Sequence, residues 1–154
     1  MVSRTNTFIG EYHYSIDSKG RINIPAKFRQ ALSPDSDGTF VITRGLDQCV
    51  WIYPLEEWER IEDNLRSFTF LRPKERDFIR QIVRHATPTK YDKQGRVMIP
   101  ATLQNIAALD DEVLIIGMLN KIEVWNPNII DDRYDSFLDL TDEDYESFAA
   151  QIKL

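Results

Sequence analysis

Two arginines that stand directly after a glycine are the residues of this sequence with the clearest capacity for chemistry. Both belong to a short pattern of an aspartate, two further residues, a glycine and the arginine, which occurs at residues 17–21 and 92–96. The planar guanidinium of arginine can bond two acceptors at once, which suits a phosphate group or the edge of a guanine. A turn does not itself need this arginine, so its recurrence favours ligand binding. The alternative is that each aspartate and arginine only satisfy each other and the local backbone.

The aspartate and glycine of each pattern are typical of a tight turn. The carboxylates of Asp17 and Asp92 can accept hydrogen bonds from backbone N–H groups of the turn. Gly20 and Gly95 can supply the positive φ that closes it. We expect these four residues to hold the turns rather than to touch an anionic partner. Residues 21–24 then alternate polar and apolar side chains, which indicates a half-buried strand.

Further cations surround the arginines and predict a basic edge. Lys19 lies inside the first turn and Lys93 inside the second, one position apart when the two copies are aligned. Pro25 suits the first position of a short helix after the strand, and that helix carries Lys27 and Arg29. The candidate DNA-binding residues are Lys19, Arg21, Lys27, Arg29, Lys93 and Arg96.

The elements that must position these residues are also duplicated. The pattern runs from the aspartate to an Ile-Pro-Ala segment in both copies without a gap, 75 residues apart (92 − 17). Further on, residues 40–43 match 113–116, and residues 50–54 match 123–127. Each copy therefore predicts strand, turn, strand, short helix, strand, turn and strand. A unit of roughly 45 residues is close to the size at which a chain cannot bury enough surface alone, so we expect the copies to share one core.

Charge is distributed unevenly along the chain. The net charge is −6, and residues 128–154 account for it with eight acidic and two basic side chains, while residues 1–127 carry 17 of each sign. Because the local field decides binding, this acidity does not exclude a nucleic-acid partner. The single cysteine, Cys49, excludes an internal disulfide and suits a reducing cytoplasm. Neither a signal peptide nor an apolar run of membrane-spanning length is visible, so no membrane partner is expected.

Helices are predicted between the two copies and near the end of the chain. Apolar residues at helical spacing indicate an acidic helix over residues 55–66 and a basic helix over about residues 73–85. Together they predict a helical hairpin joined by ion pairs. Its arginines, at every fourth position from Arg72 to Arg84, are interpreted as partners for acids of this chain or of a neighbouring subunit, with a second DNA surface as the alternative. Thr141 begins a further amphipathic helix with a capping-box pattern.

No group of residues predicts an active site. The two histidines, His13 and His85, stand apart, no metal-ligand spacing occurs, and no glycine-rich phosphate loop follows a strand. We therefore expect a protein that is not an enzyme, with no cofactor, no metal site and no small-molecule substrate. Trp58, Phe68, Phe70 and the apolar side of the helix around Phe78 provide more aromatic surface than one small barrel needs, which predicts a homo-oligomer.

Residues 17–29 resemble the signature of the AbrB/SpoVT/MazE-type swapped-hairpin DNA-binding domains. Two tandem copies, with residues 46–58 after the first and residues 122–125 closing the second, resemble the MraZ family over nearly the whole chain to about Asn126. The resemblance implies a mainly β fold with peripheral α-helices. Its core would be a double-split, swapped-hairpin β-barrel of two tandem AbrB-like units, with a helical hairpin between them. The division that follows is a first unit at residues 1–54, a linker hairpin at 55–86, a second unit at 87–127 and an acidic helical tail at 128–154.

The same resemblance implies a function. It indicates a bacterial transcriptional regulator, encoded with cell-division and cell-wall genes, that acts in the cytoplasm at the nucleoid. It would bind repeated operator sites in double-stranded DNA as a ring-shaped homo-oligomer. Carried over by position, its DNA-contacting residues are Lys19, Arg21 and Arg96. The second copy has Met98, Thr102 and Gln104 where the first has Asn23, Lys27 and Arg29, and so presents fewer cations. The alternative is a protein-binding module of the antitoxin type that docks through its acidic tail.

Overall fold

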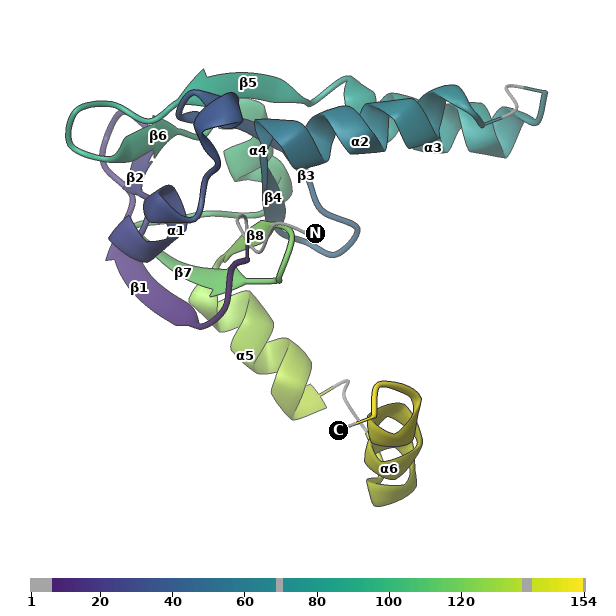
Figure 1. Cartoon of the computed structure of the whole chain (residues 1–154). Helices are drawn as coiled ribbons and strands as arrows, with labels where there is room; N and C mark the ends of the chain where they lie inside the picture. Colours follow the sequence, from purple (N-terminus) through teal and green to yellow (C-terminus); the bar gives the residue numbers. More distant parts are fainter. Residues whose placement is uncertain (1–6, 69–70, 137–139, 154) are drawn as a thin grey trace.

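The chain is mainly β, with helices around the strands (Figure 1). The computed structural model describes residues 7–68, 71–136 and 140–153, so Phe70 of the expected interface lies outside the described residues. Its strands are β1 (Glu11–Ser15), β2 (Arg21–Asn23), β3 (Thr39–Arg44), β4 (Val50–Pro54), β5 (Thr87–Lys90), β6 (Arg96–Met98), β7 (Glu112–Gly117) and β8 (Ile122–Trp125). Its helices are α1 (Ala26–Gln30), the 3-10 turn η1 (Pro34–Ser36), α2 (Leu55–Arg66), α3 (Pro73–Val83), α4 (Ala101–Ile106), α5 (Pro127–Ser136) and α6 (Asp142–Gln151).

Strands of the two copies pair with each other, and all the pairings are antiparallel. The larger sheet has the order β1-β7-β8-β4-β3-β5, and β2 and β6 form a second sheet. The first-copy strand β1 pairs with β7 of the second copy, β4 pairs with β8, and the second-copy strand β5 pairs with β3 of the first. The two copies therefore form one interleaved body, as the small size of each predicted.

The hydrogen bonds do not close these strands into the expected barrel. β1 and β5 stand at the two ends of the larger sheet, and no ladder joins them within the described residues. The β2–β6 ladder lies between these two ends as a separate element (Figure 1). Each of its strands has three residues and is soon followed by Pro25 or Pro100, which cannot donate an N–H bond and so cannot extend the ladder.

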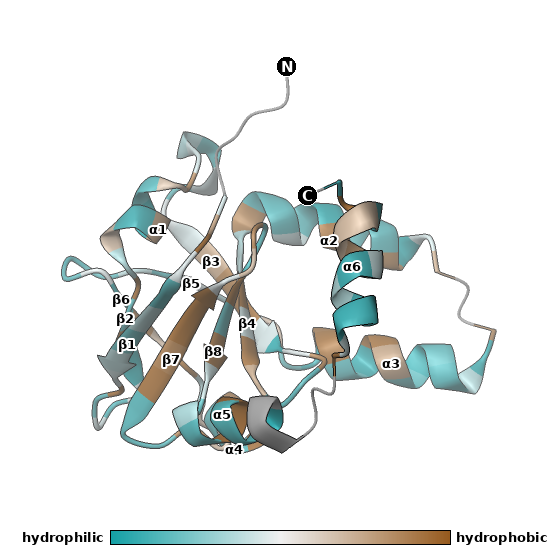
Figure 2. Cartoon of the chain, turned by 90° about the horizontal axis from the view of Figure 1, so that it is seen from below, coloured by the Kyte–Doolittle hydropathy of each residue, from teal (hydrophilic) through white to brown (hydrophobic). Residues whose placement is uncertain are grey.

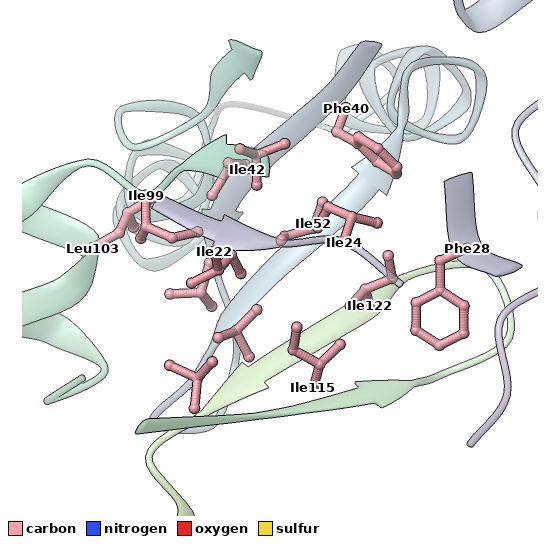
Figure 3. Packing of buried hydrophobic residues seen from close by; sticks show 14 of the residues in the cluster. Ile22, Ile24, Phe28, Phe40, Ile42, Ile52, Ile99, Leu103, Ile115 and Ile122 are labelled. Carbon is pink, nitrogen blue, oxygen red and sulfur yellow. The ribbon is translucent and has the colours of Figure 1, made fainter. Parts of the chain in front are cut away.

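A shared core of apolar side chains joins the two copies (Figure 3). Ile22 and Val97 face each other in the β2–β6 register, and each is 1% exposed. The other core side chains labelled in the figure are Ile24, Phe28, Phe40, Ile42, Ile52, Ile99, Leu103, Ile115 and Ile122. Burying one such side chain contributes about 1.5–3 kcal/mol, so separating the copies would forfeit much of the stability. In Figure 2 the inner strand β7 is apolar and the edge strand β1 is polar.

The helix predicted over residues 55–66 is confirmed, and the helix after it ends at Val83, two residues before the predicted end. The hydroxyl of Thr43 donates to the Ile82 carbonyl at 2.7 Å, which satisfies one of the last carbonyls of α3. Trp58 of α2 is not part of the exposed aromatic surface expected for an oligomer: it is 5% exposed, because it packs with Ile82 of α3 and with Tyr53 of β4 in a second buried cluster. Both helices are therefore anchored to the sheet at the end nearest to it.

The prediction that ion pairs join α2 to α3 is wrong for the described residues. The observed pairs lie within one helix or its cap, such as Arg66 with Glu62 at 3.2 Å and Arg80 with Asp77 at 2.8 Å. Side chains three or four positions apart are already neighbours on a helix, so these acids satisfy the arginines locally.

The tail, which was predicted to be helical over residues 128–154, forms two separate helices. α5 begins directly after β8, as α2 begins after β4, and its Ile130 packs into a buried cluster with Trp125. The capping box of α6 is confirmed: Thr141 Oγ1 accepts from the Asp144 N–H at 3.1 Å, and Asp144 Oδ2 accepts from the Thr141 N–H at 3.0 Å. Figure 1 shows α6 beyond the far end of α5. In the described ranges, no helix is long and apolar enough to cross a membrane.

Candidate nucleic-acid interface

The first turn is held by the carboxylate of Asp17. Its Oδ1 accepts backbone N–H bonds from Lys19 at 2.9 Å and Arg21 at 2.8 Å, and its Oδ2 accepts from Arg21 Nε at 2.7 Å. Gly20 has a φ of +79° and donates to the Asp17 carbonyl at 2.9 Å. The guanidinium of Arg21 is thus fixed through Nε. Its two terminal nitrogens have no hydrogen-bond acceptor within the described part of the chain, so both can meet a ligand.

The second turn repeats this geometry. Asp92 Oδ1 accepts from the N–H groups of Gln94 and Arg96 at 2.9 Å each, and its Oδ2 accepts from Arg96 Nε at 2.9 Å. Gly95 has a φ of +78°. Arg96 differs from its counterpart in one respect, because its Nη1 also lies 4.0 Å from Oδ2 of Asp17. The side chain of Arg96 therefore extends toward the first turn and lies near two carboxylates.

Both turn carboxylates are held in their charged form. The backbone N–H of Arg21 is the largest influence that lowers the pKa of Asp17, and the side chain of the same arginine lowers it further. The backbone N–H and side chain of Arg96 lower the pKa of Asp92 in the same way. Each ionised carboxylate balances the charge of its own arginine, so the net positive charge of this surface must come from lysines.

The β2–β6 ladder presents a row of side chains outward. Successive residues of a strand point to opposite faces, so with Ile22 and Val97 in the core their neighbours face solvent. The outward residues are Arg21, Asn23, Arg96 and Met98, with Arg21 opposite Met98 and Asn23 opposite Arg96. Met98 is 57% exposed. The sequence analysis noted Asn23 and Met98 only as differences between the copies; the strand alternation could have placed both on this surface.

Each turn is backed by a helix of the other copy. A Cβ added at Gly95 would collide with the guanidinium of Arg29 on α1, and one added at Gly20 would collide with the amide of Gln104 on α4. Arg29 Nε and Gln104 Nε2 also donate to main-chain carbonyls of their own copies, at 3.1 Å and 2.7 Å. These two residues are counterparts at the repeat spacing of 75. The charge of Arg29 therefore lies behind the second turn and not beside the first.

The three predicted lysines are exposed around this ladder. Lys19 and Lys93 lie in the two turns, and Lys27 lies on the first helix after β2. No ion pair holds them within the residues that the structure describes. The structure thus brings Lys19, Arg21, Lys93 and Arg96 to the turns on either side of one short ladder, while Arg29 takes the position behind Gly95.

The competing basic surface lies elsewhere. Figure 1 shows α3 on the opposite side of the molecule from β2 and β6. Arg80 is paired with Asp77 at 2.8 Å, Arg72 is 4.0 Å from Glu75, and Arg76 Nη1 donates to a main-chain carbonyl at 3.1 Å. Arg72 and Arg80 therefore pair with acids of the chain, as interpreted from the sequence, and Arg76 bonds a main-chain carbonyl.

A buried carboxylate that sequence reasoning missed lies on the larger sheet. Glu123 accepts from the indole N–H groups of Trp51 and Trp125 at 2.9 Å each, and the thiol of Cys49 lies 3.8 Å from it. Burial and then the charge of Glu123 raise the pKa of Cys49, so the thiol stays protonated. A glutamate among the apolar residues 122–125 was the available signal. We read this cluster as a link between β4 and β8. Among the described residues, no three His, Cys, Asp or Glu side chains group as a metal site.

Two segments of the chain, residues 7–81 and residues 82–151, each match the protein family described as "MraZ protein, putative antitoxin-like". The chain is 44% identical over 146 residues to the transcriptional regulator MraZ of Halothermothrix orenii, which covers 95% of this chain and 96% of that protein. It is 39% identical over 145 residues to the transcriptional regulator MraZ of Moorella thermoacetica, covering 94% of this chain and 96% of the relative. Two tandem matches, each containing one Asp-x-x-Gly-Arg turn, span nearly all of the described structure. The chain therefore belongs to the MraZ family.

Proposed function

We propose that this protein is a sequence-specific DNA-binding transcriptional regulator whose reading surface is the β2–β6 ladder with its two turns. Its relatives carry the name transcriptional regulator, which supports this class of function. The operator would be double-stranded DNA upstream of the bacterial division and cell-wall gene cluster, and the protein would act in the cytoplasm at the nucleoid. No catalytic step, cofactor or small-molecule substrate belongs to the proposal.

The observation that carries the proposal is a pair of arginines facing outward from a two-stranded antiparallel ribbon. The major groove of B-DNA admits such a ribbon, and a bidentate arginine–guanine contact discriminates between bases by about 1–3 kcal/mol. Asp17 and Asp92 hold Arg21 and Arg96 by Nε, so the terminal nitrogens are oriented before DNA arrives. Preorganised side chains lose less entropy on binding.

The remaining cations suit the phosphate backbone. Lys19 and Lys93 project from the turns at the ends of the ladder, and Lys27 lies on α1 beside it. Phosphate contacts set the register of a protein on DNA, while base contacts select the sequence. We therefore assign Arg21 and Arg96 to bases and the lysines to phosphates. Arg29 would support the second turn and add its charge from behind.

We further propose that the division into units at residues 1–54 and 87–127, a linker at 55–86 and a tail at 128–154 is functional. The crossed pairings of β1 with β7 and β5 with β3 support a swapped-hairpin, double-split barrel relationship between the units. One chain offers a single short reading ladder, so a ring-shaped homo-oligomer on repeated operator sites would raise affinity by linking several ladders.

A protein-binding module of the antitoxin type remains the second candidate. The antitoxin-like description of the family favours it, as does the exposed acidic helix α6. Such a module would retain its protein partner when DNA is digested. The main proposal requires instead that the key interaction depends on DNA and on Arg21.

The test is a gel shift with the chain's own upstream DNA across a salt series. Wild-type protein should bind this DNA in preference to unrelated DNA, and log affinity should fall linearly with log salt concentration. Arg21→Ala should lose the preference while circular dichroism and oligomer mass stay unchanged. Arg60→Ala, at an exposed arginine of α2, is the matched control. Normal binding by Arg21→Ala, together with loss of binding by Arg76→Ala and Arg80→Ala, would move the DNA surface to α3.

A further inference from the structure

The last helix has an apolar face that no part of the described chain covers. Tyr145, Phe148 and Ile152 are 61%, 51% and 68% exposed. At 100° per residue these side chains lie within about 60° of the helix circumference, so they form one stripe. Such a stripe is typical of a helix that packs on a partner.

Acidic side chains border this stripe. Asp142 and Glu146 lie one turn apart along one edge of it, and neither has an ion pair in the part of the chain that the structure describes. An acidic border disfavours DNA as the occupant because the phosphate backbone would repel it. The complementary surface should therefore be an apolar groove with a row of cations at the same spacing.

The linker helices provide such a groove. Trp58 and Leu65 of α2 and Ile79 and Val83 of α3 line a hollow of about 410 Å³, which we name the α2–α3 groove. Its polar lining residues, Glu62 and Arg66, are paired with each other at 3.2 Å. Val83 is 48% exposed at its edge. A second hollow shares Ile79 and Val83 and continues over the arginine side of α3.

The cations at this groove match the spacing of the acids. Arg80 and Arg84 lie one turn apart on the flank of α3 next to Val83. Arg84 has no ion pair among the described residues. Arg80 is bound to Asp77 at 2.8 Å, but both side chains are more than half exposed, and an exposed pair of this kind is worth little. Both arginines can therefore turn to a new acidic partner.

We propose that α6 of one copy docks in the α2–α3 groove of a second copy. Tyr145 and Phe148 would cover Ile79 and Val83, and the acidic edge of α6 would face the arginines. The inference rests on the proposed homo-oligomer and names the contact that links its subunits.

Two observations favour a second copy over the same chain. In Figure 1, α5 leads α6 away from α2 and α3. In addition, α6 is the last helix of the second family match, as α3 is the last helix of the first, so the two helices occupy equivalent positions in the two copies. The first-copy helix is anchored on the sheet through Ile82, whereas no residue of α6 is buried. The second helix pair is thus left incomplete within one chain.

A disulfide between two engineered copies tests this contact. One copy carries Val83→Cys and the other Ala149→Cys, which lies one turn after Tyr145 at the edge of the stripe and leaves its aromatic residues intact. The native Cys49 is buried, so it does not compete. If α6 docks in the groove, the two cysteines lie close together and mild oxidation of the mixed sample should give a covalent dimer. The dimer reports this contact because a disulfide forms only where Cα atoms come within about 7 Å.

The control replaces Val83→Cys by Lys74→Cys, an exposed position about 180° around α3 from Val83, and should give about tenfold less dimer. Arg84→Glu in the first copy should lower the yield several-fold, and Glu146→Arg in the second should restore it. Failure to form the mixed dimer would overturn the proposal. So would closure within one chain by the Val83→Cys, Ala149→Cys double variant at high dilution.

The same variants separate this inference from the proposed function. If the disulfide does not form but DNA binding still depends on Arg21, only the docking contact is wrong. If the disulfide forms and the upstream DNA is not bound, the docking contact stands and the DNA-binding proposal fails.

Discussion

The turns at residues 17–21 and 92–96 have the same geometry but different electrostatic environments. In each, one aspartate holds two backbone N–H groups and an arginine Nε, and the glycine φ values are +79° and +78°. The first turn is backed by the neutral Gln104, and the second by the cationic Arg29. Because the two copies are interleaved, the charge around each turn depends on residues of both copies.

The carboxylates differ as well. Arg21 pairs with Asp17 alone, while Arg96 pairs with Asp92 and lies 4.0 Å from Asp17. Two neighbouring carboxylates neutralise Arg96 more fully. The first arginine should therefore be the stronger DNA ligand, even though Arg29 adds charge behind the second turn.

The largest expected effect comes from removing the two arginines separately. Arg21→Ala should cost about 1–3 kcal/mol at each engaged site, roughly 5- to 150-fold in affinity, and a linked oligomer should multiply the loss. Arg96→Ala should cost less, because that side chain is already held by two carboxylates. Fluorescence anisotropy with operator and unrelated DNA measures both. An equal or greater loss for Arg96→Ala would contradict this ranking.

The next effect concerns folding. Gly20→Ala and Gly95→Ala should each cost about 1–2 kcal/mol in the free energy of unfolding, because a residue with a Cβ is strained at positive φ. Gly20→Ala should cost more, since its Cβ would also lie 3.1 Å from the main-chain oxygen of Ile99, whereas at Gly95 only the flexible Arg29 side chain must move.

Urea unfolding measures these losses. Gly45→Ala is not a suitable control, because the added Cβ would lie too close to the side chain of Cys49. Ser18→Ala is the better control, because Ser18 lies in the first turn, is exposed and does not have a positive φ. A larger loss for Gly95→Ala would show that Arg29 is fixed more firmly than the main chain beside Gly20.

A smaller effect tests whether the second turn reaches DNA. Lys19→Ala should weaken binding to all sequences alike and reduce the slope of log affinity against log salt by about one, as loss of a phosphate contact does. Lys93→Ala should do the same if both turns lie on the DNA backbone. An unchanged slope for Lys93→Ala would confine the interface to the first turn.

The smallest effect is expected in acid. The pKa values of Asp17 and Asp92 lie below their ordinary value of 3.8 in the folded protein. Their contribution to stability is therefore complete above about pH 4 and is lost as the pH falls through the lowered pKa. Asp17→Asn should flatten this acid dependence more than Asp92→Asn, because Asp17 lies near two guanidinium groups. Urea unfolding from pH 5 to pH 2 measures it; identical curves for both variants and wild type would contradict it.

The sequence by itself determined the features that depend on neighbouring residues. The strand alternation, the helix over residues 55–66 and the Thr141 capping box all follow from interactions among a few consecutive side chains, and the repeat is visible by comparing the sequence with itself. The family could also be predicted from the sequence, because its signature consists of short motifs. Within the predicted helical tail α5 was not distinguished as a separate helix, because its apolar and acidic residues do not form a clear helical stripe.

Only the tertiary structure decided which copy supports which turn. The position of Arg29 behind Gly95, the approach of Arg96 to Asp17 and the hydrogen bond from Trp51 to Glu123 all join residues more than 60 positions apart. Local propensity carries no information about such partners. They are fixed when the apolar faces of both copies are buried in one core, because burial sets the register of β2 on β6 and every outward side chain follows from it.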